Sequence, residues 1–172
     1  MAALSETDRR MLRIAYEEAK AGFDEGGCPI GSVLARGGEV IGRGRNRRVQ
    51  EGDPIAHGEM DALRNAGRLR TYKDTTLYTS LSPCMMCSGT IVQFKIPRVV
   101  ILENVNFGGN EDFLHPLRAW GEQGAIRPCV GVAGHPEGVL APLLAAQVVP
   151  PGEDAPAHPD RVLDRIEDRS SS

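Results

Sequence analysis

The sequence predicts a layered α/β domain in which helices cover a sheet, and three observations carry this prediction. Segments with helical and strand-like periodicity alternate along the chain in the order helix, hairpin, helix, strand, helix, strand. The run Val99–Leu102 is apolar at every position, which is typical of a strand buried on both faces. The chain has 172 residues, of which 41% are hydrophobic, enough for one domain with its own core. A sheet with helices packed on it accommodates all three.

The N-terminal part is predicted to form a helix followed by a hairpin. Ser5 is a suitable N-cap ahead of an amphipathic stripe, and Gly26-Gly27 ends that helix. Residues 30–36 and 39–44 are predicted strands, and Gly37-Gly38 between them is a two-residue turn signal. We assign the helix to core packing and not to chemistry.

The alternation continues through the rest of the chain. Residues 55–69 and 83–95 are predicted helices, with a short strand at 75–79 between them and the strand 99–102 after them. The later predicted elements are a helix at 111–123, a strand at 126–132, a helix at 137–147, a Pro-rich linker at 150–159 and a short helix at 160–169. The chain is therefore divided into a main domain, 1–150, and a C-terminal segment, 151–172, which we expect to cover the active site.

Two short motifs in this framework carry chemistry. His57-Gly58-Glu59 offers an imidazole and a carboxylate, and Cys84 and Cys87 offer two thiols three positions apart. With Ser82 as N-cap and Pro83 as the first helical residue, both sulfurs would lie in the first turn of a helix. The helix dipole would then favour the thiolate, the form that binds metals.

The donor set predicts one zinc ion per chain with an open coordination position. His57, Cys84 and Cys87 are three ligands, whereas a structural zinc site normally has four. The open position suits a water molecule, whose pKa zinc lowers to about 7. Glu59 would be the unligated neighbour that moves the protons. This arrangement matches the H-x-E…P-C-x-x-C pattern of zinc deaminases.

Other interpretations of these residues were weighed against the deaminase. A non-catalytic zinc-binding module would need a fourth ligand, for which Cys28 or Cys129 could be proposed. A thioredoxin-like redox pair would leave His57 and Glu59 unexplained. Asn46, taken alone, is best interpreted as a turn residue, although its amide could instead orient a ligand.

Charge and composition argue against nucleic-acid and membrane partners. The net charge is −3, and the arginines at positions 43, 45, 47 and 48 are the only basic cluster near the motifs. We interpret that cluster as a solvated strand edge rather than a phosphate contact. No apolar run approaches the roughly 20 residues that span a bilayer, and no signal peptide is recognised, so we expect a cytoplasmic setting.

The sequence resembles the fungal-type cytosine deaminases of the cytidine deaminase superfamily. The resemblance extends over roughly residues 10–110. It rests on the segments 14–19, Glu25-Gly26-Gly27, Pro29-Ile30-Gly31, His57-Gly58-Glu59, Gly67-Arg68-Leu69, 72–79, Ser82-Pro83-Cys84, Met86-Cys87, Ile96-Pro97-Arg98 and 103–107.

The resemblance implies a three-layer α/β/α sandwich with a central five-stranded mixed sheet, and a homodimer. It implies the hydrolytic deamination of cytosine to uracil, hence a place in pyrimidine salvage. By matching position, His57, Cys84 and Cys87 would bind zinc and Glu59 would be catalytic. The implied substrate-binding residues are Asn46, the backbone amides of Gly58 and Cys84, the Leu81 carbonyl and the ring of Phe107.

The chain departs from this family beyond Phe107. Family members carry a C-terminal Trp-Phe-Glu-Asp-like segment, and the counterpart here is Arg165-Ile166-Glu167-Asp168, in which Asp168 would supply the carboxylate. No tryptophan precedes it, because the only one is Trp120. Isocytosine, creatinine and guanine therefore remain alternative substrates, with a tRNA adenosine deaminase as the rival within the superfamily.

Overall fold

A five-stranded mixed sheet forms the centre of the molecule in the computed structural model, which describes residues 4–104, 110–114 and 127–129. The strand order is β2-β1-β3-β4-β5. The strands are β1 (Gly31–Arg36), β2 (Glu39–Arg45), β3 (Thr75–Leu81), β4 (Arg98–Glu103) and β5 (Arg127–Cys129). β1 pairs antiparallel with β2 and β3, whereas β3, β4 and β5 run parallel. The predicted five-stranded mixed sheet is thereby confirmed.

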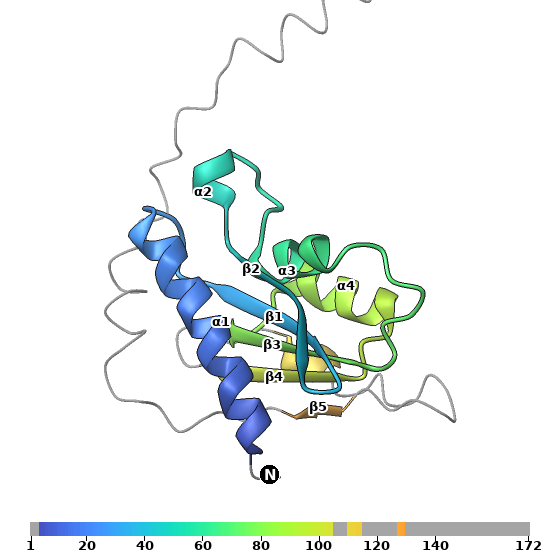
Figure 1. Cartoon of the computed structure of the whole chain (residues 1–172). Coiled ribbons are helices and arrows are strands. Elements are labelled where there is room, and N and C mark those ends of the chain that lie inside the picture. Colours follow the sequence, from blue (N-terminus) through green and yellow to red (C-terminus); the bar gives the residue numbers. More distant parts are fainter. Residues whose placement is uncertain (1–3, 105–109, 115–126, 130–172) are drawn as a thin grey trace, which may run out of the picture.

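Helices cover both faces of this sheet, as Figure 1 shows. The helices are α1 (Glu6–Asp24), α2 (Arg48–Glu51), α3 (Gly58–Ala66), α4 (Met85–Phe94) and α5 (Glu111–Leu114). α1 lies on one face, and α3 and α4 lie side by side on the other (Figure 1). The chain is thus a three-layer α/β/α sandwich, as predicted.

Side-chain alternation along the strands produces two cores, one on each face. The core under α1 contains Met11, Leu12, Ala15, Val33, Ala35, Tyr78 and Val100. The core under α3 and α4 contains Leu34, Leu63, Leu77, Ile91, Ile96, Val99, Ile101 and Leu114. Neighbouring strand residues therefore enter different cores, as the two-residue period of a strand requires. β4 contributes to both cores, which explains its unbroken apolar sequence.

Glycines have two roles around the sheet: one pair forms a hairpin turn, and another pair lets α3 approach closely. Gly37 and Gly38 form the predicted hairpin turn with φ angles of 57° and 84°, a region that favours glycine. Gly42 and Gly44 in β2 serve a different purpose, because a Cβ on either would collide with the backbone of α3. Their missing side chains let α3 lie directly on β2, and α3 carries part of the zinc motif.

Two side chains of α3 cover part of the open edge of β2. The amide of Asn65 donates to the Arg43 carbonyl at 2.8 Å, and the Arg45 N–H donates to Asp61 at 3.1 Å. An uncovered edge strand is a template for pairing with another chain. Here the Arg43 carbonyl and the Arg45 N–H on that edge have hydrogen-bond partners within the same domain.

An ion pair between the buried Asp8 and the half-buried Arg98 connects α1 to the sheet. Ser5 caps the helix through a capping box with Asp8. The Asp8 carboxylate also accepts two hydrogen bonds from the Arg98 guanidinium, at 2.6 and 3.0 Å, and one from the Tyr78 hydroxyl at 2.9 Å. The guanidinium holds the pKa of Asp8 well below its usual range. Burial and the Asp8 carboxylate raise the pKa of Tyr78 to about 12.

Some predicted helix boundaries are wrong. α4 begins at Met85 with Cys84 as its N-cap, so Ser82 is not the cap and Pro83 is not helical. A residue before proline favours extended backbone, and the first i to i+4 bond of the helix runs from Ser88 N–H to the Cys84 carbonyl. α3 spans only Gly58–Ala66, because Gly67 adopts a positive φ of 71°. The short helix α2 was not predicted.

Other predictions lie partly or wholly outside the described residues. Of the predicted helix 111–123 only α5 is described, and of the strand 126–132 only β5. The helix 137–147, the linker 150–159, the helix 160–169 and the division at residue 150 remain predictions. None of the described helices combines the length and the apolar character that crossing a bilayer requires.

Candidate active site

His57 occupies the N-cap of α3, where the chain passes from an extended loop into the helix. Its backbone is extended, with φ −78° and ψ 158°, and its side chain makes no capping hydrogen bond. Just before it, Asp53 accepts from the Ile55 N–H at 2.9 Å in a tight turn. The predicted placement of His57 at a helix start is confirmed, and its ring is not used to cap the helix.

Cys84 occupies the N-cap of α4, and Cys87 lies in the first turn of that helix. The Cys84 backbone is also extended, with φ −69° and ψ 174°, and its side chain makes no capping hydrogen bond. Serine, threonine, aspartate or asparagine usually fills an N-cap, because its oxygen accepts from the first helical N–H groups. At both helices a potential metal ligand stands there instead.

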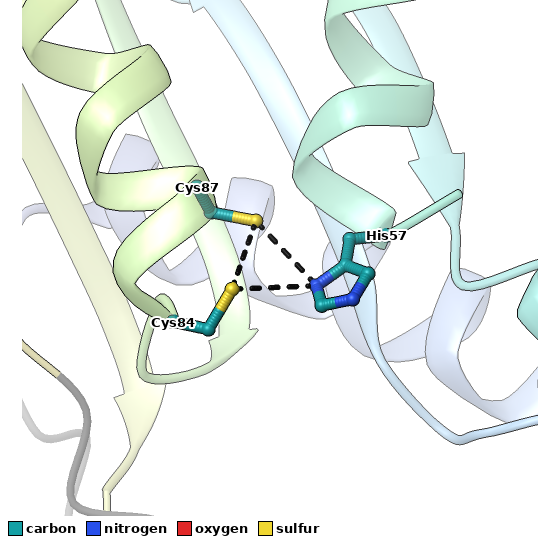
Figure 2. A group of neighbouring side chains, drawn as sticks. All are labelled: His57, Cys84 and Cys87. Atoms are coloured by element: carbon teal, nitrogen blue, oxygen red, sulfur yellow. Dashed lines mark hydrogen bonds between the residues drawn. The ribbon is translucent and has the colours of Figure 1, made fainter. Parts of the chain in front are cut away.

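These three side chains converge from two helix N-termini, as Figure 2 shows. The two sulfurs are 3.6 Å apart, and His57 Nδ1 lies 3.5 Å from Cys84 Sγ and 3.6 Å from Cys87 Sγ. Ligands of a tetrahedral zinc ion would be separated by about 3.8 Å between sulfurs and about 3.6 Å between sulfur and nitrogen, given bonds of about 2.3 and 2.0–2.1 Å. The residues therefore fit zinc without rearrangement.

Burial makes this cluster dependent on a cation. Burial raises the pKa of the Cys87 thiol far above its ordinary value, and the Glu59 carboxylate and Cys84 raise it further. Burial, with help from Arg48, lowers the pKa of His57, which favours the neutral imidazole that a metal binds. A divalent cation would provide the positive charge that two buried thiolates need.

Glu59 lies beside the three ligands without being one of them. It is the second residue of α3 and only 4% exposed. Its carboxyl group interacts with the Cys87 side chain, and burial raises its pKa above the ordinary value. Among the residues that the structure describes, the candidate metal group contains His57, Cys84 and Cys87 alone, with ligand atoms within 4.8 Å of one another. That is the open, three-ligand set expected of a catalytic zinc.

The Ile30 carbonyl brings Asn46 next to the zinc motif. Asn46 N–H donates to it at 2.8 Å, and a Cβ on Gly58 would lie 3.0 Å from the same oxygen. Asn46 is 1% exposed, and its side-chain oxygen accepts from the Arg48 N–H at 3.1 Å. The turn predicted from the bare sequence is therefore present, and the residue also lies close to Gly58. Leu81, the last residue of β3, is buried three positions before Cys84.

The arginine cluster is largely neutralised by the chain itself. Glu18 pairs with Arg43 at 3.0 Å and with Arg45 at 2.9 Å, Glu25 pairs with Arg45 at 2.8 Å, and Asp61 pairs with Arg47 at 3.2 Å. Arg48 is exposed at the start of α2. β2 is an edge strand of the described sheet, so Arg43 and Arg45 lie on a strand edge, as predicted.

Other site predictions lie outside the described part of the chain, namely Phe107, Asp168 and Trp120. Cys28 is a free, half-buried cysteine and is not a member of the candidate metal group. Sequence reasoning missed Asp61, whose carboxylate turns inward from α3. The only available signal was its position two residues after Glu59.

Comparison with known proteins agrees with this geometry. The family model of the cytidine and deoxycytidylate deaminase zinc-binding region matches residues 5–103. The cytosine deaminase of Candida albicans is 52% identical over 110 residues, which are 62% of this chain and 73% of that protein. The tRNA-specific adenosine deaminase of Buchnera aphidicola is 40% identical over 99 residues, 56% of this chain and 66% of that protein.

A solved structure adds the same assignment from the fold. It comes from a study of A-to-I editing by tRNA:A34 deaminases and superimposes with a TM-score of 0.51 at 32% identity, covering 54% of this chain and 74% of that one. The match of the family model includes His57, Glu59, Cys84 and Cys87. The chain belongs to the zinc-binding cytidine and deoxycytidylate deaminase family and is a zinc-dependent aminohydrolase.

Proposed function

We propose that the protein deaminates free cytosine, converting cytosine and water to uracil and ammonia. The observation that carries this proposal is the buried Glu59 carboxyl beside a three-ligand metal group that fits zinc. The choice of cytosine is supported by the 52% identity to a cytosine deaminase. It is supported further by the ion pairs of three clustered arginines, which offset the positive charge that a nucleic-acid backbone would need; the arginines are Arg43, Arg45 and Arg47, and their partners are Glu18, Glu25 and Asp61.

His57, Cys84 and Cys87 would hold the zinc ion. When bound, zinc supplies Lewis-acid chemistry that makes water a nucleophile near neutral pH. Glu59 would accept one proton from the attacking water and pass it to the ring nitrogen. It would then accept the proton of the hydroxyl group added to the ring and pass it to the leaving amine, so that the carbonyl of uracil forms as ammonia departs. A carboxyl group with both tasks needs a pKa near the working pH, and burial moves the pKa of Glu59 in that direction. The positive ends of α3 and α4 favour negative charge in the same place.

Polar groups around the metal group would orient the base. The Asn46 amide is proposed to hydrogen-bond the pyrimidine edge, together with the backbone N–H groups of Gly58 and Cys84 and the Leu81 carbonyl. A fixed backbone donor stabilises charge that develops on the ring without reorganising. Phe107 is proposed to stack on the base, and Asp168 to accept from the leaving amine.

The assembly and the cellular setting are also proposals. We propose a homodimer in a reducing, cytoplasmic environment, where the reaction would serve pyrimidine salvage. Free thiols and a thiolate-bound metal suit a reducing compartment.

An ammonia-release screen tests the activity. The panel is cytosine, isocytosine, 5-fluorocytosine, creatinine, guanine, cytidine and adenosine, with a tRNA substrate added. Cytosine should be turned over with the highest kcat/KM. Preference for another heterocycle, or for tRNA, would replace cytosine as the substrate and leave the deaminase class intact.

The Glu59→Gln variant tests the proton carrier. It keeps the size of the side chain and removes its acid–base function, so zinc content should be retained and kcat should fall by about 10²–10⁴-fold. Zinc is measured by metal analysis and turnover by ammonia release. Normal turnover in this variant would show that Glu59 does not carry the protons.

A further inference from the structure

Asp61 is a buried carboxylate that the proposed reaction does not use. It lies in the first turn of α3, two residues after Glu59, and is 4% exposed. A buried charge is costly unless it is paired and hydrogen-bonded, so the partners of Asp61 indicate what it does.

The partners of Asp61 are the two residues that flank Asn46. The backbone N–H of Arg45 donates to Asp61 Oδ2 at 3.1 Å, and Nε of Arg47 donates to the same oxygen at 3.2 Å. Arg45 is the last residue of β2, and Arg47 is the N-cap of α2. One carboxylate therefore holds the chain immediately before and immediately after the proposed substrate-binding asparagine.

Residues 46 and 47 make further hydrogen bonds, and these leave the side-chain N–H₂ group of Asn46 unused. Its N–H donates to the Ile30 carbonyl and its Oδ1 accepts from Arg48. The Arg47 N–H donates to the Ala56 carbonyl at 2.8 Å, one residue before His57. Within the described ranges, Nδ2 of Asn46 has no hydrogen-bond partner. The backbone and one side-chain atom are thus fixed, and the side-chain N–H₂ group is left for a ligand.

We propose that Asp61 is a positioning residue for the substrate. By holding Arg45 and Arg47 it fixes residues 45–47 against α3, so that the Asn46 amide keeps one orientation relative to Gly58 and the metal group. This inference rests on the proposed function, in which Asn46 binds the base. Its physical content is preorganisation: a misplacement of about 1 Å in a positioning group can cost about 10²-fold in rate or binding.

The Asp61→Asn variant is the first test. Asparagine keeps an oxygen that can accept from the Arg45 N–H, but it loses the charge that holds the Arg47 guanidinium. KM for cytosine should rise by about 10–100-fold, kcat should change little, and zinc content should be retained. Asp24→Asn is the matched control, because Asp24 pairs with Lys20 on the exposed surface of α1 and should leave KM unchanged.

A double-mutant cycle with Asn46→Ala separates positioning from general stabilisation. If Asp61 acts through Asn46, Asp61→Asn should have less than about a twofold effect on KM once Asn46 is absent. The same cycle is repeated in the zinc-loaded Glu59→Gln background, where the Kd for cytosine is measured in place of KM. Low turnover then does not hide the result. An undiminished effect of Asp61→Asn in the Asn46→Ala background, or loss of zinc in Asp61→Asn, would overturn the inference.

The two proposals fail in different ways. If the unaltered protein releases no ammonia from cytosine, the proposed substrate is wrong, and the cycle is run with whichever compound of the panel is turned over. If cytosine is turned over and Asp61→Asn has an unchanged KM, the substrate stands and the positioning role of Asp61 is wrong.

Discussion

The close contact between Gly44 and α3 makes the metal group sensitive to a single added methyl. In Gly44→Ala, the new Cβ would lie 2.6 Å from the Asp61 carbonyl carbon and 2.7 Å from Asp61 Cβ, with Ala62 N also in contact. These atoms belong to the helix itself and cannot rotate away. α3 would have to retreat by more than about 0.8 Å, the difference between 2.6 Å and the 3.4 Å at which ordinary contact begins, because Ala62 N lies nearer still.

Such a shift affects both stability and metal binding. Overpacking of this kind costs about 1–3 kcal/mol, which for a chain of this size corresponds to a fall in Tm of about 2–12 °C. α3 also carries His57 at its N-cap, opposite the two sulfurs of α4. Zinc sites tolerate deviations of only about 0.2 Å in ligand distance, so zinc affinity should fall as well.

The stability part is measured by thermal unfolding of zinc-free protein, so that metal binding does not contribute, and zinc affinity is measured by competition with a chelator. Gly89→Ala is the matched control. Gly89 lies within α4, a Cβ there meets no atom within 4 Å, and helix propensity predicts stabilisation by up to about 1 kcal/mol. If Gly44→Ala matched the unaltered protein in Tm and in zinc affinity, the close approach of α3 to β2 would not set the position of His57.

Three further predictions concern the metal and the Asp8–Arg98 pair. Cys84→Ser should weaken zinc binding by more than about 100-fold, whereas the control Cys28→Ser should leave zinc binding unchanged. Full zinc occupancy of the Cys84→Ser protein after dialysis would show that Cys84 is not a ligand. Removal of zinc by a chelator should lower the free energy of unfolding by about 2.7 kcal/mol, relative to protein that has free zinc at 100 times its Kd. Added zinc should restore that stability, and an unchanged Tm would contradict coupling between zinc binding and folding. Asp8→Asn should cost about 2–3 kcal/mol at pH 7, less than a fully buried pair because the Arg98 side chain is 32% exposed. The folded pKa of Asp8 lies well below its unfolded value of about 3.9, so this stabilisation is fully present above the unfolded pKa and is lost progressively as pH falls from there towards the folded pKa. In urea unfolding of zinc-free protein, the difference between Asp8→Asn and the unaltered protein should therefore be constant from pH 7 to about pH 5 and smaller, but not zero, near pH 3. A difference that stayed constant down to pH 3 would refute the assignment.

Much of the fold follows from local sequence. The capping signal at Ser5, the Gly37-Gly38 turn and the unbroken apolar run of β4 each act within a few residues, and each is found in the structure as predicted. The zinc motif is also local in each half, because His57 and Glu59, and Cys84 and Cys87, are close neighbours in the chain. Errors arose at helix starts, where the residues before α3 and α4 make tight turns or remain extended.

The sequence alone determined which residues could bind zinc and that helices and strands would alternate, because donor chemistry, periodicity and capping are properties of short segments. Only the tertiary structure decided that Arg43 and Arg45 pair with Glu18 and that Arg47 pairs with Asp61. It also decided that Asn46 and Gly58 both lie close to the Ile30 carbonyl. These contacts join residues far apart in the chain. Those of Asp61 form because Gly42 and Gly44 let α3 lie directly on β2. The distance between two packed elements therefore decides which groups meet at the site. The periodicity of the sequence does not encode that distance.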